Sequence, residues 1–397
     1  MKVENKSEKN NNLPGESKGA AASVPINNEK PPNHEEAEPS TSGQPESRSC
    51  LVPSLAEVKM EQVKWLLEHY IEANSLSIVA GRGGVGKGLF SDWLAARTTS
   101  GCSLGDYSGP MPEMGEVLFF SAEDNPSTKL APCACAAGAK MDKVRYMTPG
   151  LYRKMTKGRT LEIGPEMCGI IDLVKPKVVI IDPVQSVLPG DMSITSPKVR
   201  RVLEALAEKA ESDGFSVILV LHQNKSKSKD PRVALAGNND LWNLARSVVA
   251  VGTVPGNEDL FYVSSEKLND AVRGETMIFR KEEVIVNTAE GDPIKTVAAV
   301  FDSFSDKRYA DFEAGKTMQV SQARAAVKTA IMLALGKNQR DGVASTELQE
   351  TVTEATDCSE TSYVRARNEL KAEDAIEKYK DGHGGWSWRI REIPSCA

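Results

Sequence analysis

Short apolar runs alternate with amphipathic segments along residues 51–311. The apolar runs lie at 76–80, 117–121, 178–181, 217–221 and 248–252. Continuous apolar runs of this length are typical of strands buried on both faces of a sheet. Because amphipathic, helix-like stretches separate them, the pattern predicts an α/β domain with a mainly parallel sheet.

The spacing of apolar residues changes beyond residue 321. Residues 325–335 have a helical pattern, Ser345 can cap a second helix, and Ser359 can cap a third. Alternating segments then flank a glycine-rich turn within 375–390, as in a hairpin. Three helices followed by a hairpin predict a C-terminal winged-helix-like domain.

The first 50 residues have a different composition. They are rich in Asn, Glu, Lys, Pro, Ser and Gly and contain almost no large apolar side chains, so they cannot bury enough surface to fold. We therefore expect a disordered tail over 1–50, the α/β domain over 51–311, a linker over 312–322 and the winged-helix-like domain over 323–397.

Composition and charge restrict the partners. The chain has 397 residues, 40% of them hydrophobic, and a net charge of -6. This acidic balance argues against a surface coated with phosphate-binding charge, so contacts to nucleic acid require local basic patches. Seven scattered cysteines form neither a secreted disulfide framework nor a usual zinc site. Without a membrane-length apolar stretch or a signal peptide, the expected location is the cytoplasm.

A glycine-rich loop follows the first apolar run and precedes a helix-like segment. Its glycines would turn backbone N–H groups toward phosphates, and its lysine would reach the β- and γ-phosphates of ATP. The alternative is a plain glycine-rich turn between strand and helix. The last residue lacks the Ser or Thr hydroxyl that usually binds Mg²⁺. The candidate ATP-binding residues are Gly81, Arg82, Gly83, Gly84, Val85, Gly86, Lys87 and Gly88.

Two later runs end in carboxylates. Glu123 follows the run 117–121, where it could polarise a water, and Asp182 ends the run 178–181, where it could hold Mg²⁺. Alone, the first could be a solvated acidic loop and the second a turn residue before Pro183. The order of the three elements along the chain favours a shared site for ATP and Mg²⁺.

Polar and basic residues follow the fourth run. His222 stands directly after it, and a basic segment continues to residue 232. The histidine could sense the γ-phosphate, but a purely structural role is an equally good interpretation. The basic segment could equally be a solvated surface loop. The basic residues of the segment are Lys225, Lys227, Lys229 and Arg232.

Together these motifs resemble the RecA-like ATPases related to the plasmid RepA hexameric replicative helicases of plasmids, phages and integrated elements. The resemblance extends over roughly 55–390. It includes G-R-G-G-V-G-K-G at 81–88, S-A-E-D at 121–124, I-I-D-P at 180–183 and H-Q-N-K at 222–225. Two further matches are A-R-S-V at 245–248 and K-L-N at 267–269.

The resemblance implies roles for these residues. Lys87 would bind phosphate, Glu123 would activate water, Asp182 would serve the metal, and His222 would couple the nucleotide to a DNA loop. Arg246 and Lys267 would be candidate fingers that reach the ATP of a neighbouring subunit. Either cation could instead be an ordinary surface charge.

The resemblance also implies contacts to DNA. The basic residues after His222 would face single-stranded DNA in the ring and bind its backbone. In the C-terminal domain, Arg365 and Arg367 lie on the expected recognition helix, where DNA and protein binding are comparable alternatives.

Two departures from the family pattern bear on ATP hydrolysis. One is Gly88, and the other is A-G-N-N at 236–239, where small hydroxyl residues are expected. Ser91 is one turn beyond Gly88 on a different line, so it is not an obvious replacement.

The sequence therefore supports a leading function and two alternatives. The first is a hexameric DNA helicase or translocase that hydrolyses ATP during replication of a mobile element, with replication proteins as further partners. The second is a nucleotide-gated DNA-binding or regulatory protein with little hydrolysis, which Gly88 favours. The third is a RadA-like recombination ATPase, although no cysteine cluster resembling that group's zinc finger precedes the loop.

Overall fold

The computed structural model describes residues 54–190, 192–223, 231–236, 239–288, 290–338, 342–380 and 385–391. The expected tail over 1–50 lies outside these ranges. The chain divides into Met1–Glu61, in which the structure describes a 3-10 turn at Leu55–Glu57, and Gln62–Ala397, which contains the other described elements.

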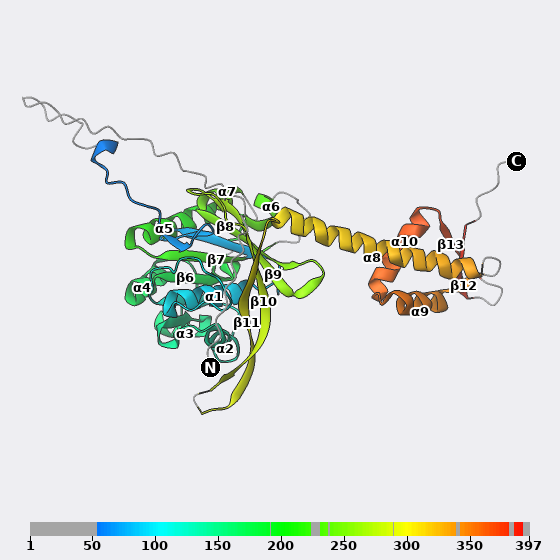
Figure 1. Ribbon diagram of the computed structural model, residues 1–397, viewed down its shortest axis with the longest axis horizontal. Coiled ribbons are helices and arrows are strands. Elements are labelled where there is room, and N and C mark those ends of the chain that lie inside the picture. Colours follow the sequence, from blue (N-terminus) through cyan, green and yellow to red (C-terminus); the bar gives the residue numbers. More distant parts are fainter. Residues whose placement is uncertain are drawn as a thin grey trace, which may run out of the picture. The chain divides into compact units, whose positions relative to one another are not determined.

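The larger unit is built on a nine-stranded sheet in the order β11-β10-β9-β8-β3-β7-β6-β4-β5 (Figure 1). Strands β8, β3, β7, β6, β4 and β5 are parallel to one another, while β9, β10 and β11 continue the sheet from β8 in antiparallel pairing. The parallel strands are β3 (Leu76–Gly81), β4 (Val117–Ser121), β5 (Val144–Met147), β6 (Val178–Asp182), β7 (Ser216–His222) and β8 (Ser247–Val254). All five predicted strands are present.

Helices cover both faces of the parallel strands, which explains why the strands are continuously apolar. Along β3, Ile78 belongs to one hydrophobic core and Val79 to the other. The first core includes Leu203 of α5, and the second includes Trp93 of α1. The helices of this region are α1 (Lys87–Ser100), α2 (Ala131–Ala136), α3 (Pro149–Met155), α4 (Pro165–Val174), α5 (Pro197–Asp213), α6 (Pro231–Ala236) and α7 (Asn239–Leu244).

The antiparallel part of the sheet was not predicted. It consists of β9 (Asn257–Leu268), β10 (Thr276–Asn287) and β11 (Pro293–Ser305), and in Figure 1 the β10–β11 hairpin runs past α1 and α2. Phe279 lies at its centre, with ring centroids 5.9 Å from Phe90 and 5.1 Å from Trp93 of α1. Aromatic packing of this kind fixes the hairpin against the helix that begins at the glycine-rich loop.

The remaining elements are short. Strands β1 (Trp65–Leu67) and β2 (Ile71–Glu72) form a small antiparallel pair. Single turns of helix occur at Pro126–Leu130, Met141–Lys143 and Val184–Val187. In the described part of the chain, no helix is both long and apolar enough to cross a membrane.

A long helix, α8 (Tyr309–Lys337), leads into the C-terminal elements. The residues expected as a linker, 312–322, lie inside this helix, because they include no proline and a single glycine, Gly315, does not end a helix. Its first turn contributes Tyr309 and Phe312 to the first core, whereas Val327 and Ile331 belong to a third core.

The third core unites α8 with α9 (Ser345–Thr356), α10 (Glu360–Ala372) and a three-stranded sheet. That sheet has the order β12-β14-β13, with β12 at Val343–Ala344, β13 at Ile376–Lys380 and β14 at Trp386–Ile390. The predicted hairpin and the Ser359 cap are confirmed, since Ser359 accepts from the N–H of Ser362. Ser345, however, is the first residue of α9 rather than its cap.

Candidate functional site

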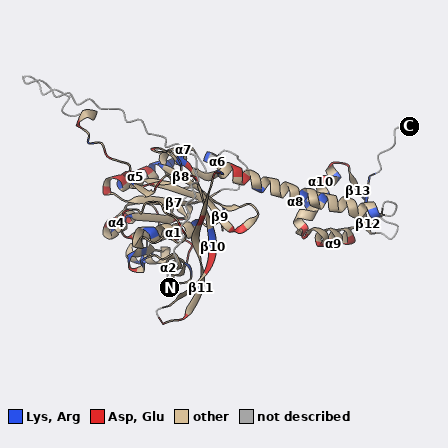
Figure 2. Ribbon diagram, in the orientation of Figure 1, with Lys and Arg blue, Asp and Glu red and all other residues tan. Residues whose placement is uncertain are grey.

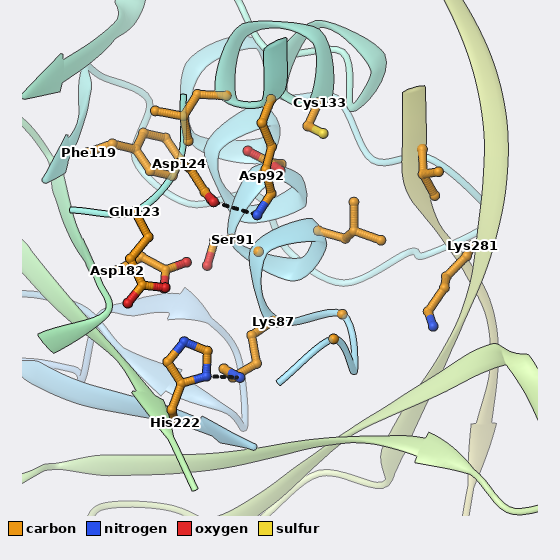
Figure 3. A pocket seen from close by; sticks show the side chains of 17 residues that line it. Lys87, Ser91, Asp92, Phe119, Glu123, Asp124, Cys133, Asp182, His222 and Lys281 are labelled. Carbon is orange, nitrogen blue, oxygen red and sulfur yellow. Dashed lines mark hydrogen bonds and ion pairs between the residues drawn. The ribbon is translucent and has the colours of Figure 1, made fainter. Parts of the chain in front are cut away.

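The carboxyl ends of four parallel strands bring the predicted residues to one edge of the sheet. The glycine-rich loop follows β3, Glu123 follows β4, Asp182 ends β6, and His222 ends β7. They border a cavity of about 330 Å³ (Figure 3). Its lining consists of Gly84, Gly86, Lys87, Gly88, Leu89, Ser91, Asp92, Phe119, Glu123, Asp124, Lys129, Leu130, Cys133, Asp182, His222, Lys281 and Val297.

The loop needs glycine at two positions for different reasons. A Cβ on Gly81 would collide with the carbonyl oxygen of Val251 on the adjacent strand β8. Gly86 has a φ of 115°, and a Cβ there would meet the ring of Phe261 at 3.0 Å. Helix α1 begins directly after it, so the free N–H groups and the positive end of the helix dipole are placed at the cavity.

Lys87 is buried in the loop, with 5% of its surface exposed. Its Nζ donates to the carbonyl oxygens of Gly81, at 3.0 Å, and Arg82, at 2.7 Å, and lies 3.2 Å from Nδ1 of His222. Burial lowers the pKa of Lys87 to about 8, although the negative charges of Asp182 and Glu123 oppose that shift. The ammonium is therefore held by weak neutral acceptors that an anionic ligand can replace.

His222 is a neutral partner of this lysine. Burial lowers its pKa, and the positive charge of Lys87 lowers it further. If Nδ1 accepts from Lys87, the ring proton is on Nε2. Its backbone oxygen accepts from Nε2 of Gln185, at 2.9 Å, in the turn after Asp182. The histidine thus joins the loop lysine to the neighbouring strand ends.

The carboxylates of the cavity differ in their surroundings. Burial, followed by the charge of Asp124, raises the pKa of Asp182 to about 6. Asp124 forms an ion pair with Lys129 at 2.5 Å. Glu123 is exposed and accepts from the hydroxyl of Ser186 at 3.2 Å. Asp182 therefore suits a bound cation, while Glu123 is open to a water.

These groups fit Mg²⁺, which prefers oxygen ligands and usually keeps several waters and phosphate oxygens. Within the described residues no group of three or more acidic, histidine or cysteine side chains forms a ready metal site. Partly buried Asp182, buried Asp92 and an unpaired buried hydroxyl, Ser91, line the cavity. This sparse set agrees with a cation carried in by a nucleotide rather than one held by protein alone.

The two predicted finger residues lie at the other edge of the sheet. The N–H of exposed Arg246 donates to the carbonyl of Leu76, at the start of β3, and Lys267 pairs with Val248 at the start of β8. Lys267 Nζ donates to three carbonyl oxygens at the end of α7, at 2.7, 3.2 and 2.5 Å. Neither residue lines the cavity of its own chain.

The predicted DNA-binding residues are scattered. Lys225, Lys227 and Lys229 lie outside the described residues. Arg232 is exposed on α6, and Arg365 is exposed on α10.

Arg367 on α10 has a structural environment. Its guanidinium lies 4.9 Å from the centroid of the Trp388 ring and 5.5 Å from that of Tyr363, and its Nη2 donates to Asn368. Because this stacking holds the guanidinium against the third core, Arg367 is poorly placed to contact DNA.

Several lining residues were not singled out from the sequence. Asp92 is four residues beyond Gly88, a helical spacing that could have revealed it. Lys129 and Lys281 come from a π-helical turn and from β10, and no local pattern connects them to the loop. Ser91 was discounted because of its direction, yet it lines the cavity, since helical side chains lean toward the preceding turn.

The part of the chain that forms most of the site matches a known family. Residues 43–228 match the model of a family described as an AAA domain, a segment that includes the loop, Glu123, Asp182 and His222. No curated protein matches the chain. Among solved structures, the chain is similar to a KaiC-like protein from the hyperthermophilic archaeon Pyrococcus horikoshii OT3. The identity is 14% and the TM-score 0.39, over 61% of this chain and 99% of the other.

The family match covers the segment that supplies most of the cavity, and the sheet places the phosphate loop, the acidic strand ends and the histidine at one edge. These are the parts that bind a nucleotide triphosphate and its cation. Residues 43–228 therefore resemble an AAA domain, and the site they form has the parts of a P-loop ATPase site for ATP.

Proposed function

We propose that this ATPase is a DNA motor: a hexameric helicase or translocase that acts on single-stranded DNA during replication of a mobile element. The observation that carries the proposal is the contact between Lys87 and His222. A residue that binds phosphate thereby touches the end of the strand from which the basic segment continues. Gain or loss of the γ-phosphate would change this contact and so the start of the segment.

Hydrolysis requires groups on both sides of the γ-phosphate. Lys87 and the first N–H groups of α1 would bind the phosphate oxygens, and Glu123 would orient the attacking water and accept its proton. Ser186 holds Glu123 from the turn that follows Asp182. Bound Mg²⁺ would neutralise charge on the phosphates, and Asp182 would hold it.

Contacts from the strand ends to α8 give the nucleotide site a route to the C-terminal elements. Gln223 donates to the hydroxyl of Tyr309 at 2.9 Å, and Arg82 of the phosphate loop lies 3.5 Å from Glu313. Both partners are in the first turns of α8, whose last turns belong to the third core. A shift of the loop or of His222 would therefore be transmitted to α8 through these two contacts.

We assign DNA binding in the C-terminal domain to its hairpin and treat the domain as winged-helix-like. Trp386 on β14 is 49% exposed. Lys378 and Lys380 on β13 lie 4.3 and 5.5 Å from its ring centroid. An exposed aromatic ring with adjacent cations suits stacking on bases and contact with phosphates. Acidic and basic residues are both spread through α8 to α10 (Figure 2), which favours a local contact over a broad basic face.

The position of the candidate fingers supports an assembly in which neighbouring subunits share a site, as in the proposed hexamer. Arg246 and the phosphate loop lie at opposite ends of β3, about 16 Å of strand apart. An arginine so placed cannot serve its own ATP, but its exposure suits contact with the site of a neighbouring subunit. Lys267 is already engaged with α7, so Arg246 is the better candidate.

Steady-state ATP hydrolysis with and without single-stranded DNA tests the motor. We expect DNA to stimulate turnover, Lys87→Ala to abolish it, and Glu123→Gln to lower it by about 10²–10⁴-fold while ATP binding persists. Stimulation that survives Lys87→Ala, or no stimulation of the unaltered protein, would contradict the motor.

Gly88 supports a second candidate, a nucleotide-gated DNA-binding protein with little hydrolysis. Such a protein would assemble and bind DNA in an ATP-dependent way, and Glu123→Gln would leave both unchanged. Light scattering and DNA binding with ATP, without ATP and with ADP distinguish it from the motor, whose DNA affinity should follow the hydrolysis cycle.

A further inference from the structure

The first turn of α1 contains open space at the position where P-loop ATPases usually carry a hydroxyl. Gly88 is the second residue of the helix and lines the cavity. A Cβ built on it would meet no atom within 4 Å. The cavity therefore continues up to the helix backbone, and whatever binds there must be held by side chains from elsewhere.

Ser91 lines the same space and is only 1% exposed. In the described part of the chain, its Oγ has no hydrogen-bond partner. Three later residues of the same helix behave differently: Thr98, Thr99 and Ser100 each donate to the carbonyl four residues earlier, at 2.9, 2.8 and 2.8 Å. A buried hydroxyl without this bond is unusual and remains available to a ligand.

Helix geometry directs this hydroxyl toward the gap. Helical side chains lean toward the N-terminus, so Ser91, three residues beyond Gly88, lies over the turn that contains Gly88. Figure 3 shows its oxygen on the side of α1 that faces Glu123 and Asp182. The unpaired oxygen is thus between the open space and the carboxylate expected to hold the cation.

Asp92 adds a second oxygen group from the same turn. Its side chain is buried, lines the cavity, and lies close enough to Asp182 and Asp124 for their charges to repel. A divalent cation among these groups would replace repulsion by attraction. The neighbouring Lys129 offsets only part of this charge, because it is paired with Asp124.

We propose that Ser91 takes over the role of the missing loop hydroxyl and holds the Mg²⁺ of the bound nucleotide, directly or through one of its waters, opposite Asp182. The inference rests on ATP binding by this site. The hydroxyl ligand would then come from one helical turn further along α1 than usual and reach back toward the open space at Gly88.

Cation binding can be measured separately from catalysis. A fluorescent ADP analogue titrated in EDTA reports nucleotide affinity without metal, and electron paramagnetic resonance of Mn²⁺ added to the protein–ADP complex reports metal affinity. We expect Ser91→Ala to leave the first unchanged and to weaken the second by about 10- to 100-fold. Ser77→Ala is the matched control, because Ser77 is also buried and unpaired in the described structure but does not line the cavity.

Two rescues separate a ligand role from a packing role. Ser91→Thr retains a hydroxyl and should bind Mn²⁺ far better than Ser91→Ala. Gly88→Ser, for which there is space, should restore Mn²⁺ affinity when it is added to Ser91→Ala.

The outcomes distinguish this inference from the proposed function. Unchanged Mn²⁺ affinity in Ser91→Ala, or an equal loss in Ser77→Ala, would overturn the role of Ser91 while leaving ATP binding intact. If the unaltered protein bound no nucleotide either with Mg²⁺ or in EDTA, the ATP-binding site and the role of Ser91 would both be wrong.

Discussion

Two glycines of the phosphate loop have opposite requirements for space. Gly81 faces the backbone of β8, whereas Gly88 faces open cavity. We expect Gly81→Ala to lower the free energy of unfolding by about 1–3 kcal/mol, because the added methyl group must displace a strand. Gly88→Ala should raise it by about 0.5–1 kcal/mol, since alanine is the better helix former. Urea denaturation of the two variants measures both effects, and equal stabilities would contradict this account.

The lowered pKa of Lys87, about 8, makes nucleotide binding depend on pH. Phosphate favours the charged ammonium, so its pKa rises in the complex. Below pH 8 the lysine is charged in both states and contributes no pH dependence. Above pH 8 the free protein loses the proton, binding must take one up, and affinity falls by up to about tenfold per pH unit.

This pH dependence can be measured by ADP titration between pH 7 and 9.5 and by calorimetry at pH 8.5 in buffers of different ionisation enthalpy. Lys87→Arg, which stays charged throughout, is the control and should lose proton uptake. Absence of proton uptake by the unaltered protein at pH 8.5 would show that the lysine is not the titrating group.

At the scale of elements, the β13–β14 hairpin is the part of the C-terminal domain best suited to DNA. We expect Trp386→Ala to weaken binding of single-stranded DNA by about 1–3 kcal/mol, roughly 5- to 150-fold. Lys378→Ala should instead reduce the slope of log affinity against log salt by about 0.7, as loss of one phosphate contact does.

Fluorescence anisotropy with a labelled oligonucleotide measures both changes. Tyr146→Ala serves as the control, because Tyr146 on β5 is 47% exposed, close to the 49% of Trp386. Equal losses in the two aromatic variants would show that the hairpin has no special role. Arg367→Ala should mainly destabilise the domain, since its guanidinium packs on Trp388.

Helix α8 shows how one element can belong to two cores. Its first turns contact Gln223 and Arg82 beside the nucleotide site, and its later turns pack with α9 and α10. A pattern of apolar residues alone suggested a break here, because the middle of the helix has few buried positions. The helix is continuous nonetheless, as its backbone bonds form within the segment itself.

At the scale of the whole molecule, a site shared between subunits makes a distinctive prediction. Arg246→Ala and Lys87→Ala should each be inactive alone. In mixed assemblies, a Lys87→Ala subunit still supplies Arg246 to the intact loop of an Arg246→Ala neighbour. We therefore expect mixtures of the two inactive variants to regain part of the DNA-stimulated ATP turnover. Full activity of Arg246→Ala alone, or an inactive mixture, would refute the shared site.

Much of the core could be predicted from local patterns. The runs that became β3, β4, β6, β7 and β8 are continuously apolar because helices cover both faces of the sheet. Strands β9 to β11 were missed, because only part of each is buried and polar stretches interrupt their apolar runs. They pair antiparallel with the strands that come directly before and after them in the sequence, so hairpin signals such as Pro255-Gly256 could have revealed them.

By itself, the sequence determined the phosphate loop, the acidic strand ends and the histidine, together with the edge at which they meet. The physical reason is that the carboxyl ends of parallel strands lie at one edge of a sheet. Only the tertiary structure decided which further groups reach that edge. Ser91 lines the cavity because helical side chains lean toward the N-terminus of α1. Lys129 reaches it from the π-helical turn after β4, and Lys281 from the β10–β11 hairpin. Arg246 lies beside β3, the strand that leads into the phosphate loop, but at the opposite end of that strand. In a parallel sheet the amino ends and the carboxyl ends of the strands form opposite edges.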